Sequence, residues 1–414
     1  MKNAKETIQI GGVYGIGIIG ALLINIMLTK RMSDYEFGQY IVIISLIAII
    51  NSIITSGHLN FALNHLGKKF ENKLKKIRFF TLTKIVTTII IIFAIIYAFE
   101  VISLESGVDK IILIMTLILG SLVAIGKVEF RVNGCNLKSQ ISDQVIFNIS
   151  MIFLISLFNR IDLQTSISIT FISLMLSFVY ILKDKPVFLR WDKGALRKKY
   201  INKWIGEGRS FVLIGLYAIV STQIGIIILG NQNLYDEIVY LKISQQICAL
   251  FVVGQIVINI ATTKKIRQAY ANKNLKYITE IVGKITRINA LVFTLFALIF
   301  YVNMEQILKL LYSDLDQSKI IFSVIPLLIA QIVNISFGNV GTILQMTGGV
   351  KLVTKIEYYM MVITILLMTT LALHGKSNAY TYSIVIALII ILSNAMTAYT
   401  LYKKNGILPL GYLK

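Results

Sequence analysis

ALLINIMLTKRMSDYEFGQYIVIISLIAIINSIITSGHLNFALNHLGKK, residues 21–69, contains two long apolar runs joined by a short turn. Its first apolar run ends at Lys30 and Arg31, a short acidic turn follows at 34–38, and its second apolar run leads to a basic cluster that begins at Lys68. A helix needs about 20 apolar residues to cross a bilayer, and each run is close to that length. The stretch therefore predicts a membrane-spanning helical hairpin.

The whole chain extends this pattern. Of its 414 residues, 56% are hydrophobic, and its mean hydropathy is +0.76, whereas soluble domains are about 45–50% apolar. The apolar runs do not alternate with polar residues as barrel strands do, and the chain has only three prolines. The run at 8–28 is long for a signal peptide and lacks a clear cleavage site, which indicates a retained first span. We therefore expect an all-α integral membrane protein.

The apolar runs predict about twelve transmembrane helices. They lie at 8–29, 39–63, 79–99, 110–130, 144–159, 165–182, 206–229, 238–262, 285–303, 319–345, 355–373 and 378–402. With the N-terminus in the cytoplasm, the inner connections hold 32 Lys and Arg residues and the outer connections hold 7. The positive-inside rule then predicts that both termini are cytoplasmic. The same bias accounts for the formal charge of +21 without any nucleic-acid partner.

A weak internal repeat divides the spans into two sets of six. YEFGQY at 35–40 aligns with YDEIVY at 235–240, on the turn between the first and second spans of each half. The turns at 133–134 and 347–348 match in the same way after the fourth span. An even number of spans gives both halves the same orientation, as in transporters with parallel repeats. We expect two parallel six-helix lobes around a central cavity.

The expected domain limits follow from the repeat. One lobe covers 1–182 and the other covers 206–402, with a cytoplasmic tail at 403–414. The linker at 183–205 is strongly basic. It is either a solvated connection or an amphipathic segment that lies on anionic lipid.

Enzyme signatures are missing from the sequence. The two cysteines, Cys135 and Cys248, form no CxxC pair and no disulfide framework. The three histidines are scattered, and neither a phosphate-binding loop nor a metal-ligand spacing occurs. We expect no catalytic residues, no metal and no cofactor.

Polar residues instead follow single helix faces within the spans. In the span at 319–345, for example, Gln331, Asn334, Gly338 and Gln345 fall on one face. An amide that faces lipid loses its water partners at a cost of a few kcal/mol. Such faces therefore make interhelical hydrogen bonds or line a water-filled passage, and we favour the passage for whole stripes. The candidate lining residues are Asn25, Asn51, Thr55, His58, Gln245, Gln255, Asn259, Gln331, Asn334 and Gln345.

Cationic residues near the span ends form a second set of candidates. The outer candidates are Lys30, Arg31 and Lys242, and the inner candidates are Lys84 and Arg131. Each either snorkels to the lipid headgroups or binds an anionic headgroup at one mouth of the passage.

Proline gives one more candidate. Pro326 removes a backbone donor within the span at 319–345. It predicts a static kink or a hinge.

Two segments carry a resemblance to a known family. LTKRMSDYEFGQY at 28–40 resembles the opening of Wzx-type polysaccharide flippases, which export O-antigen and capsule units. LQMTGGVK at 344–351 resembles that family's inner turn, whereas the turn at 227–240 fits less well because Ile238 replaces a common glycine. These flippases belong to the multidrug/oligosaccharidyl-lipid/polysaccharide (MOP) exporter superfamily.

The resemblance implies a function and its partners. Two six-helix lobes would form a V around an often cationic cavity in a bacterial inner membrane. They would move a polyprenyl-diphosphate-linked oligosaccharide, a unit of O-antigen lipopolysaccharide or capsule, to the periplasmic leaflet by alternating access. Implied partners are this lipid-linked oligosaccharide, membrane lipid, and polysaccharide polymerase and chain-length proteins. This chain departs from the family in having no Lys or Arg near the middle of a predicted span.

Two alternatives stay open. A drug/cation antiporter of the same superfamily would need a carboxylate within the membrane, whereas the acidic residues here fall in loops or at span ends. A membrane polysaccharide polymerase or ligase would need a large outer loop, and the predicted outer loops are short.

Overall fold

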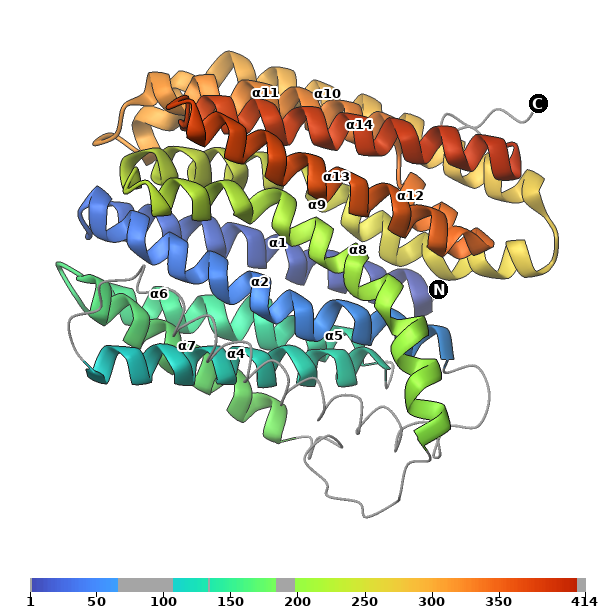
Figure 1. Cartoon of the computed structure of the whole chain (residues 1–414), viewed down its shortest axis with the longest axis horizontal. Helices are drawn as coiled ribbons and strands as arrows, with labels where there is room; N and C mark the ends of the chain where they lie inside the picture. The colour runs from blue at the N-terminus through green and yellow to red at the C-terminus, as the bar shows by residue number, and fades with distance from the viewer. Residues whose placement is uncertain (1, 66–106, 133–134, 184–197, 408–414) are drawn as a thin grey trace. The chain divides into compact units, whose positions relative to one another are not determined.

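A computed structural model describes residues 2–65, 107–132, 135–183 and 198–407, and these residues fold almost entirely into helices (Figure 1). Within this part of the chain, nine helical stretches are long and apolar enough to cross a membrane. The predicted all-α membrane fold is confirmed. The predicted span at 79–99, which contains Lys84, lies outside the described residues.

The chain divides into two compact units. One consists of Ile16–Gln223, and the other joins Met1–Gly15 to Ile224–Lys414. The divisions fall inside two helices, α1 (Lys2–Thr29) and α8 (Lys198–Asn231).

The first unit is built on α1, α2 (Asp34–His65), α4 (Gly107–Val132) and α7 (Leu163–Leu182). Its core lies between α2, α4 and α7, where Ile43, Leu117 and Ile167 pack together. Asp162 begins α7 as its N-cap, because its carboxylate accepts the Thr165 N–H at 2.8 Å. Hydrogen bonds from Thr165 also lower the pKa of the Asp162 carboxyl below its ordinary value.

The predicted span at 144–159 is not one helix. It divides into α5 (Asn136–Gln140), the π-helix η1 (Ile141–Phe147) and α6 (Asn148–Ser156). The Asn148 amide donates to the Gly17 carbonyl of α1 at 2.7 Å. A Cβ at Gly17 would overlap the Gln144 side chain, so this glycine lets the π-helix approach α1 closely.

The second unit contains five long helices besides the end of α8. They are α9 (Tyr235–Ala271), α10 (Leu275–Leu311), α11 (Gln317–Phe337), α13 (Val350–Leu373) and α14 (Ala379–Asn405). Between α11 and α13 lie α12 (Val340–Leu344) and the π-helix η3 (Gln345–Gly349). Helix α11 packs along both α9 and α14 (Figure 1).

The predicted span at 319–345 is interrupted. Helix α11 continues through Pro326, the expected static kink or hinge, and ends at Phe337. The interruption falls at Gly338, whose φ of 67° and ψ of −160° lie in a region that essentially only glycine adopts. Helix α12 starts two residues later, at Val340.

Matching contacts in the two units agree with the predicted repeat. In the first unit, the Arg31 guanidinium donates to the Ile155 and Phe158 carbonyls at the end of α6. In the second unit, the Gln232 amide donates to the Ala372 carbonyl near the end of α13, at 3.2 Å. Each half therefore ties the turn of its first hairpin to the end of its fifth span.

Candidate functional site

Four amide side chains from three helices of the second unit meet in one network, which we call the amide cluster: Gln255 of α9, Gln331 and Asn334 of α11, and Asn394 of α14. The Asn334 amide donates to the Gln331 oxygen at 3.0 Å and to the Gln255 oxygen at 3.3 Å. The Asn394 amide donates to the Asn334 oxygen at 3.0 Å. Gln331 and Asn334 are three residues apart, so both project from the same face of α11.

The structure therefore brings together part of two predicted stripes and adds a residue that sequence reasoning missed. Gln255, Gln331 and Asn334 were expected as lining residues of two different spans, whereas Asn394 is an isolated amide in an apolar run and belongs to no stripe. The cluster makes interhelical hydrogen bonds, one of the two roles expected for such residues. Its ends keep free groups, because the Gln331 Nε2 and the Asn394 Oδ1 have no hydrogen-bond partner among the described residues.

The amide cluster is joined to the helix break. Gln255 is buried, and its Nε2 donates to the Gly338 carbonyl at 3.3 Å. A small pocket, open to solvent on one side, lies beside this contact between α9, α10 and the α11–α12 break. Its polar lining residues are Gln255, Thr262, Thr286, Asn289, Gly338 and Asn339, and its other lining residues are Ile and Val.

The remaining predicted lining residues are not part of the amide cluster. Asn25 and Gln245 are half-buried, on α1 and α9, and Gln345 is half-buried at the start of η3. Asn51, on α2, accepts a hydrogen bond from the Ser121 hydroxyl of α4 at 2.9 Å.

Four other predicted residues lie in described helices, but their side chains are outside the described part of the structure. They are Thr55 and His58 of α2, Arg131 of α4 and Asn259 of α9.

The outer cations differ in their surroundings. Lys30 is exposed, whereas the guanidinium of Arg31 is engaged by the carbonyls of Ile155 and Phe158. Lys242 lies seven residues into α9, because this helix begins at Tyr235 rather than at the predicted 238. At 1.5 Å per residue, Lys242 is therefore about 10 Å from the start of its helix.

Of the headgroup candidates that lie among the described residues, Lys242 lies deepest within a candidate membrane span. It is half-buried within the stretch Tyr235–Gln255, between the fully buried Leu241 and Ile243. None of the described residues forms a hydrogen bond or an ion pair with its ammonium group. This leaves an intramembrane positive charge that a bound anion could neutralise.

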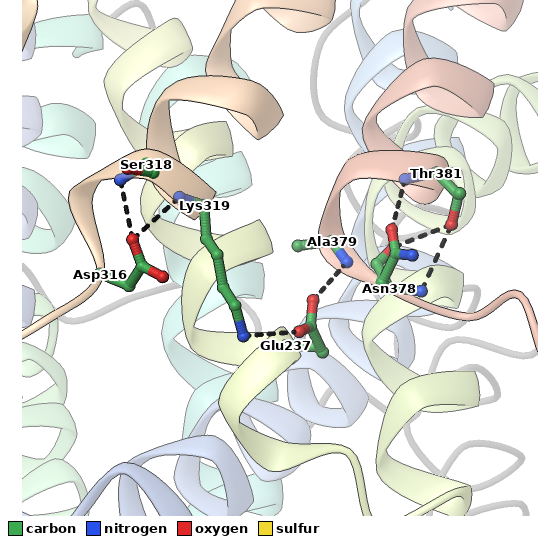
Figure 2. Close-up of polar contacts among 7 residues, drawn as sticks. All are labelled: Glu237, Asp316, Ser318, Lys319, Asn378, Ala379 and Thr381. Carbon is green, nitrogen blue, oxygen red and sulfur yellow. Dashed lines mark hydrogen bonds and ion pairs between the residues drawn. The ribbon is translucent and has the colours of Figure 1, made fainter.

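Lys319, unlike Lys242, has an acidic partner. It belongs to a cluster of polar residues at the N-termini of three helices (Figure 2). Its ammonium group lies 3.4 Å from Glu237 Oε1, and the other oxygen of Glu237 accepts the Ala379 N–H at 2.8 Å. Asn378 is the N-cap of α14, since its side chain accepts the Thr381 N–H. Glu237 therefore neutralises Lys319 and ties the first turns of α9, α11 and α14 together.

One acidic residue departs from the sequence expectation. Glu357 was expected at the end of a span, but α13 begins at Val350 and places it two turns inside that helix. Its Oε2 is buried and has no hydrogen-bond partner among the described residues.

Comparison with known proteins shows the fold. No family model and no curated protein matches the sequence. Among solved structures, the lipid II flippase MurJ in an inward closed conformation matches with a TM-score of 0.73 at 13% identity, over 95% of this chain and 87% of MurJ. A MOP superfamily transporter from Pyrococcus furiosus matches with a TM-score of 0.66 at 14% identity, over 97% and 96% of the two chains.

A MATE protein in complex with MaL6 matches with a TM-score of 0.63 at 14% identity, over 95% of this chain and 94% of that one. These identities are too low to transfer a substrate, but the likeness extends over nearly the full length of each pair. The chain has the fold of MOP superfamily transporters.

Proposed function

We propose that this protein is a flippase that moves a lipid-linked oligosaccharide with a diphosphate headgroup from the cytoplasmic to the periplasmic leaflet of a bacterial inner membrane. Lys242 is the observation that carries the proposal. A charged side chain costs about 2.5–3.5 kcal/mol at the centre of a membrane helix on insertion scales, and less toward the helix end where Lys242 lies. No described acidic residue offsets this cost for Lys242. A phosphate oxygen would supply a charge-assisted hydrogen bond.

The other candidate residues have different roles in this proposal, as headgroup contacts, structural contacts or sugar contacts. Lys30 is exposed and available to a headgroup at the outer end of α1, whereas Arg31 serves mainly to hold the end of α6. Lys84 and Arg131 stay proposed headgroup contacts at the inner mouth. The free groups of the amide cluster suit sugar hydroxyls, because an amide both donates and accepts hydrogen bonds.

The wider setting follows from the resemblance to polysaccharide flippases. We propose cytoplasmic termini, alternating access between the two leaflets, and action beside a polysaccharide polymerase and chain-length proteins. The MurJ likeness supports a lipid-linked cargo, because MurJ is a lipid II flippase of the same fold.

The test is export of surface polysaccharide in cells that depend on this protein. Lys242→Ala should reduce polysaccharide strongly at unchanged protein level, and Lys242→Arg should keep most of it because the charge is retained. Lys319→Ala is the matched control, since Glu237 already neutralises this lysine. Equal export by Lys242→Ala and the control would remove Lys242 from the mechanism.

A cation-coupled drug antiporter is the second candidate, and Glu357 favours it. A buried carboxyl oxygen without a partner is the kind of group that binds a proton or a cation inside a membrane. Glu357→Gln would then abolish efflux of cationic drugs and leave surface polysaccharide unchanged. The opposite pattern would support the flippase.

A further inference from the structure

The pocket beside the helix break, which we call the break pocket, has unused hydrogen-bonding groups. Thr286 of α10 is 3% exposed, yet its hydroxyl bonds to none of the described residues. Thr279, two turns earlier on the same helix and equally buried, donates to its own helix, to the Leu275 carbonyl at 3.0 Å. Helical threonines usually make this bond, so the Thr286 hydroxyl is free for another partner.

The residues around Thr286 fit closely against its side chain and have unused hydrogen-bonding groups of their own. A Cβ at Gly338 would overlap the Thr286 side chain, so the break and the hydroxyl fit together only because residue 338 is glycine. Asn339 begins α12 without a side-chain capping bond. Asn289, one turn after Thr286, likewise has no hydrogen bond among the described residues. Three polar side chains with unused groups therefore line one small pocket.

The chemistry of the lining selects an uncharged, hydroxyl-bearing ligand. No charged residue lines the break pocket, so neither a phosphate nor a divalent cation finds a counter-charge there. Hydroxyl and amide groups both donate and accept, as the hydroxyls of a sugar do. The aliphatic wall, which includes Ile281, Ile285 and Ile335, offers contact to the C–H surface of a sugar ring.

The depth of the pocket fits the same ligand. Thr286 and Asn289 lie at the first residues of the predicted span 285–303, which the Lys and Arg bias places at the cytoplasmic end. This is the level at which the glycan of a cytoplasmic-leaflet lipid meets the protein.

We propose that the break pocket is a sugar-binding subsite of the second unit, in which Thr286, Asn289 and Asn339 hydrogen-bond the hydroxyls of one uncharged sugar ring of the cargo. The subsite rests on the proposed flippase function, and it adds a glycan contact separate from Lys242. It makes no contact with the diphosphate.

The test is saturation-transfer NMR on the full-length protein in deuterated detergent, with methyl glucoside and methyl N-acetylglucosaminide as probes. Irradiation of the methyl resonances saturates the isoleucine wall, and a bound glycoside then shows transfer to its ring protons. We expect transfer in the wild type for at least one glycoside and a loss of five-fold or more in Thr286→Val. Thr279→Val is the matched control, because its hydroxyl is bonded within α10 and lies outside the pocket; it should keep the wild-type transfer.

The outcomes separate the possible ligands. If Thr286→Val does not fold, Asn289→Ala should show the same loss at wild-type thermal stability. Absence of transfer in the wild type, or equal transfer in Thr286→Val, Asn289→Ala and Thr279→Val, overturns the proposal. The proposal is also overturned if NaCl raises the thermal stability of the wild type more than choline chloride does and Thr286→Val abolishes that difference. Such a result would identify a cation site. If the glycoside binds as expected but Lys242→Ala exports polysaccharide normally, only the proposed headgroup role of Lys242 is refuted. If Lys242→Ala loses export but no glycoside transfer is seen, only the sugar subsite is refuted.

Discussion

Replacing Gly338 by alanine changes the helix break in two ways that the structure separates. The backbone at Gly338 lies in a region open essentially to glycine only, and forcing another residue there costs about 1–3 kcal/mol. The new methyl group would also overlap Thr286, and overpacking of this kind costs about 1–3 kcal/mol. Gly338→Ala should therefore destabilise the protein by about 2–6 kcal/mol.

The assay is thermal unfolding in detergent, followed by the loss of monodisperse protein on size-exclusion chromatography after heating. Membrane proteins often unfold irreversibly, so variants are compared by apparent Tm at one heating rate. Gly341→Ala is the matched control, because a Cβ at Gly341 meets no atom within 4 Å and α12 is an ordinary helix there. This control should match the wild type or exceed it slightly, since alanine favours helix.

A double variant divides the effect into its parts. Thr286→Ala removes the atoms that the new methyl group would overlap, so adding it to Gly338→Ala should restore part of the lost stability but not the backbone part. Equal Tm values for Gly338→Ala and Gly341→Ala would refute the strained break. An unchanged Tm on adding Thr286→Ala would refute the steric part.

Three further predictions concern single residues of the two units. Arg31→Met should cost about 1–2 kcal/mol of stability by thermal unfolding, because it leaves the carbonyls at the end of α6 without their charged donor; Lys30→Met, at the exposed neighbour, should cost nothing measurable. Glu237→Ala should lower stability by about 1 kcal/mol through the unpaired Ala379 N–H, and the loss should be nearly salt-independent because the exposed ion pair contributes little. Cys135 is exposed and should react with a membrane-impermeant maleimide in inverted membrane vesicles only; labelling in intact cells would contradict the cytoplasmic termini.

The lengths of the apolar runs predicted most of the described helices, because each span must satisfy its own backbone hydrogen bonds inside the membrane. The spacing of polar residues placed Gln331 and Asn334 on one face of α11, where the structure has them. The break at Gly338 could not be predicted in the same way. The helix-face pattern of polar residues runs through it, and a single glycine in a helical pattern does not by itself reveal a break or the backbone angles found at Gly338.

Long-range partners were the other feature that sequence reasoning missed. Arg31 reads as a free cation at a span end, but its partners are backbone carbonyls more than 120 residues away. Asn394 stands alone in an apolar run, so only the packing of α14 against α11 brings it to the amide cluster. Backbone acceptors and single amides leave no pattern in a sequence, whereas stripes do.

The proposed contact between Lys242 and an anionic headgroup can be measured as binding. The measurement is binding of a polyprenyl diphosphate to the purified full-length protein by native mass spectrometry, with the wild type, Lys242→Ala and Lys319→Ala compared. A lost charge-assisted hydrogen bond is worth about 1.5–3 kcal/mol, or about 10- to 150-fold in Kd. We expect a loss of that size for Lys242→Ala and none for Lys319→Ala, whose ammonium group is held by Glu237. Equal affinity of all three proteins would contradict the assignment of Lys242 to an anionic lipid headgroup.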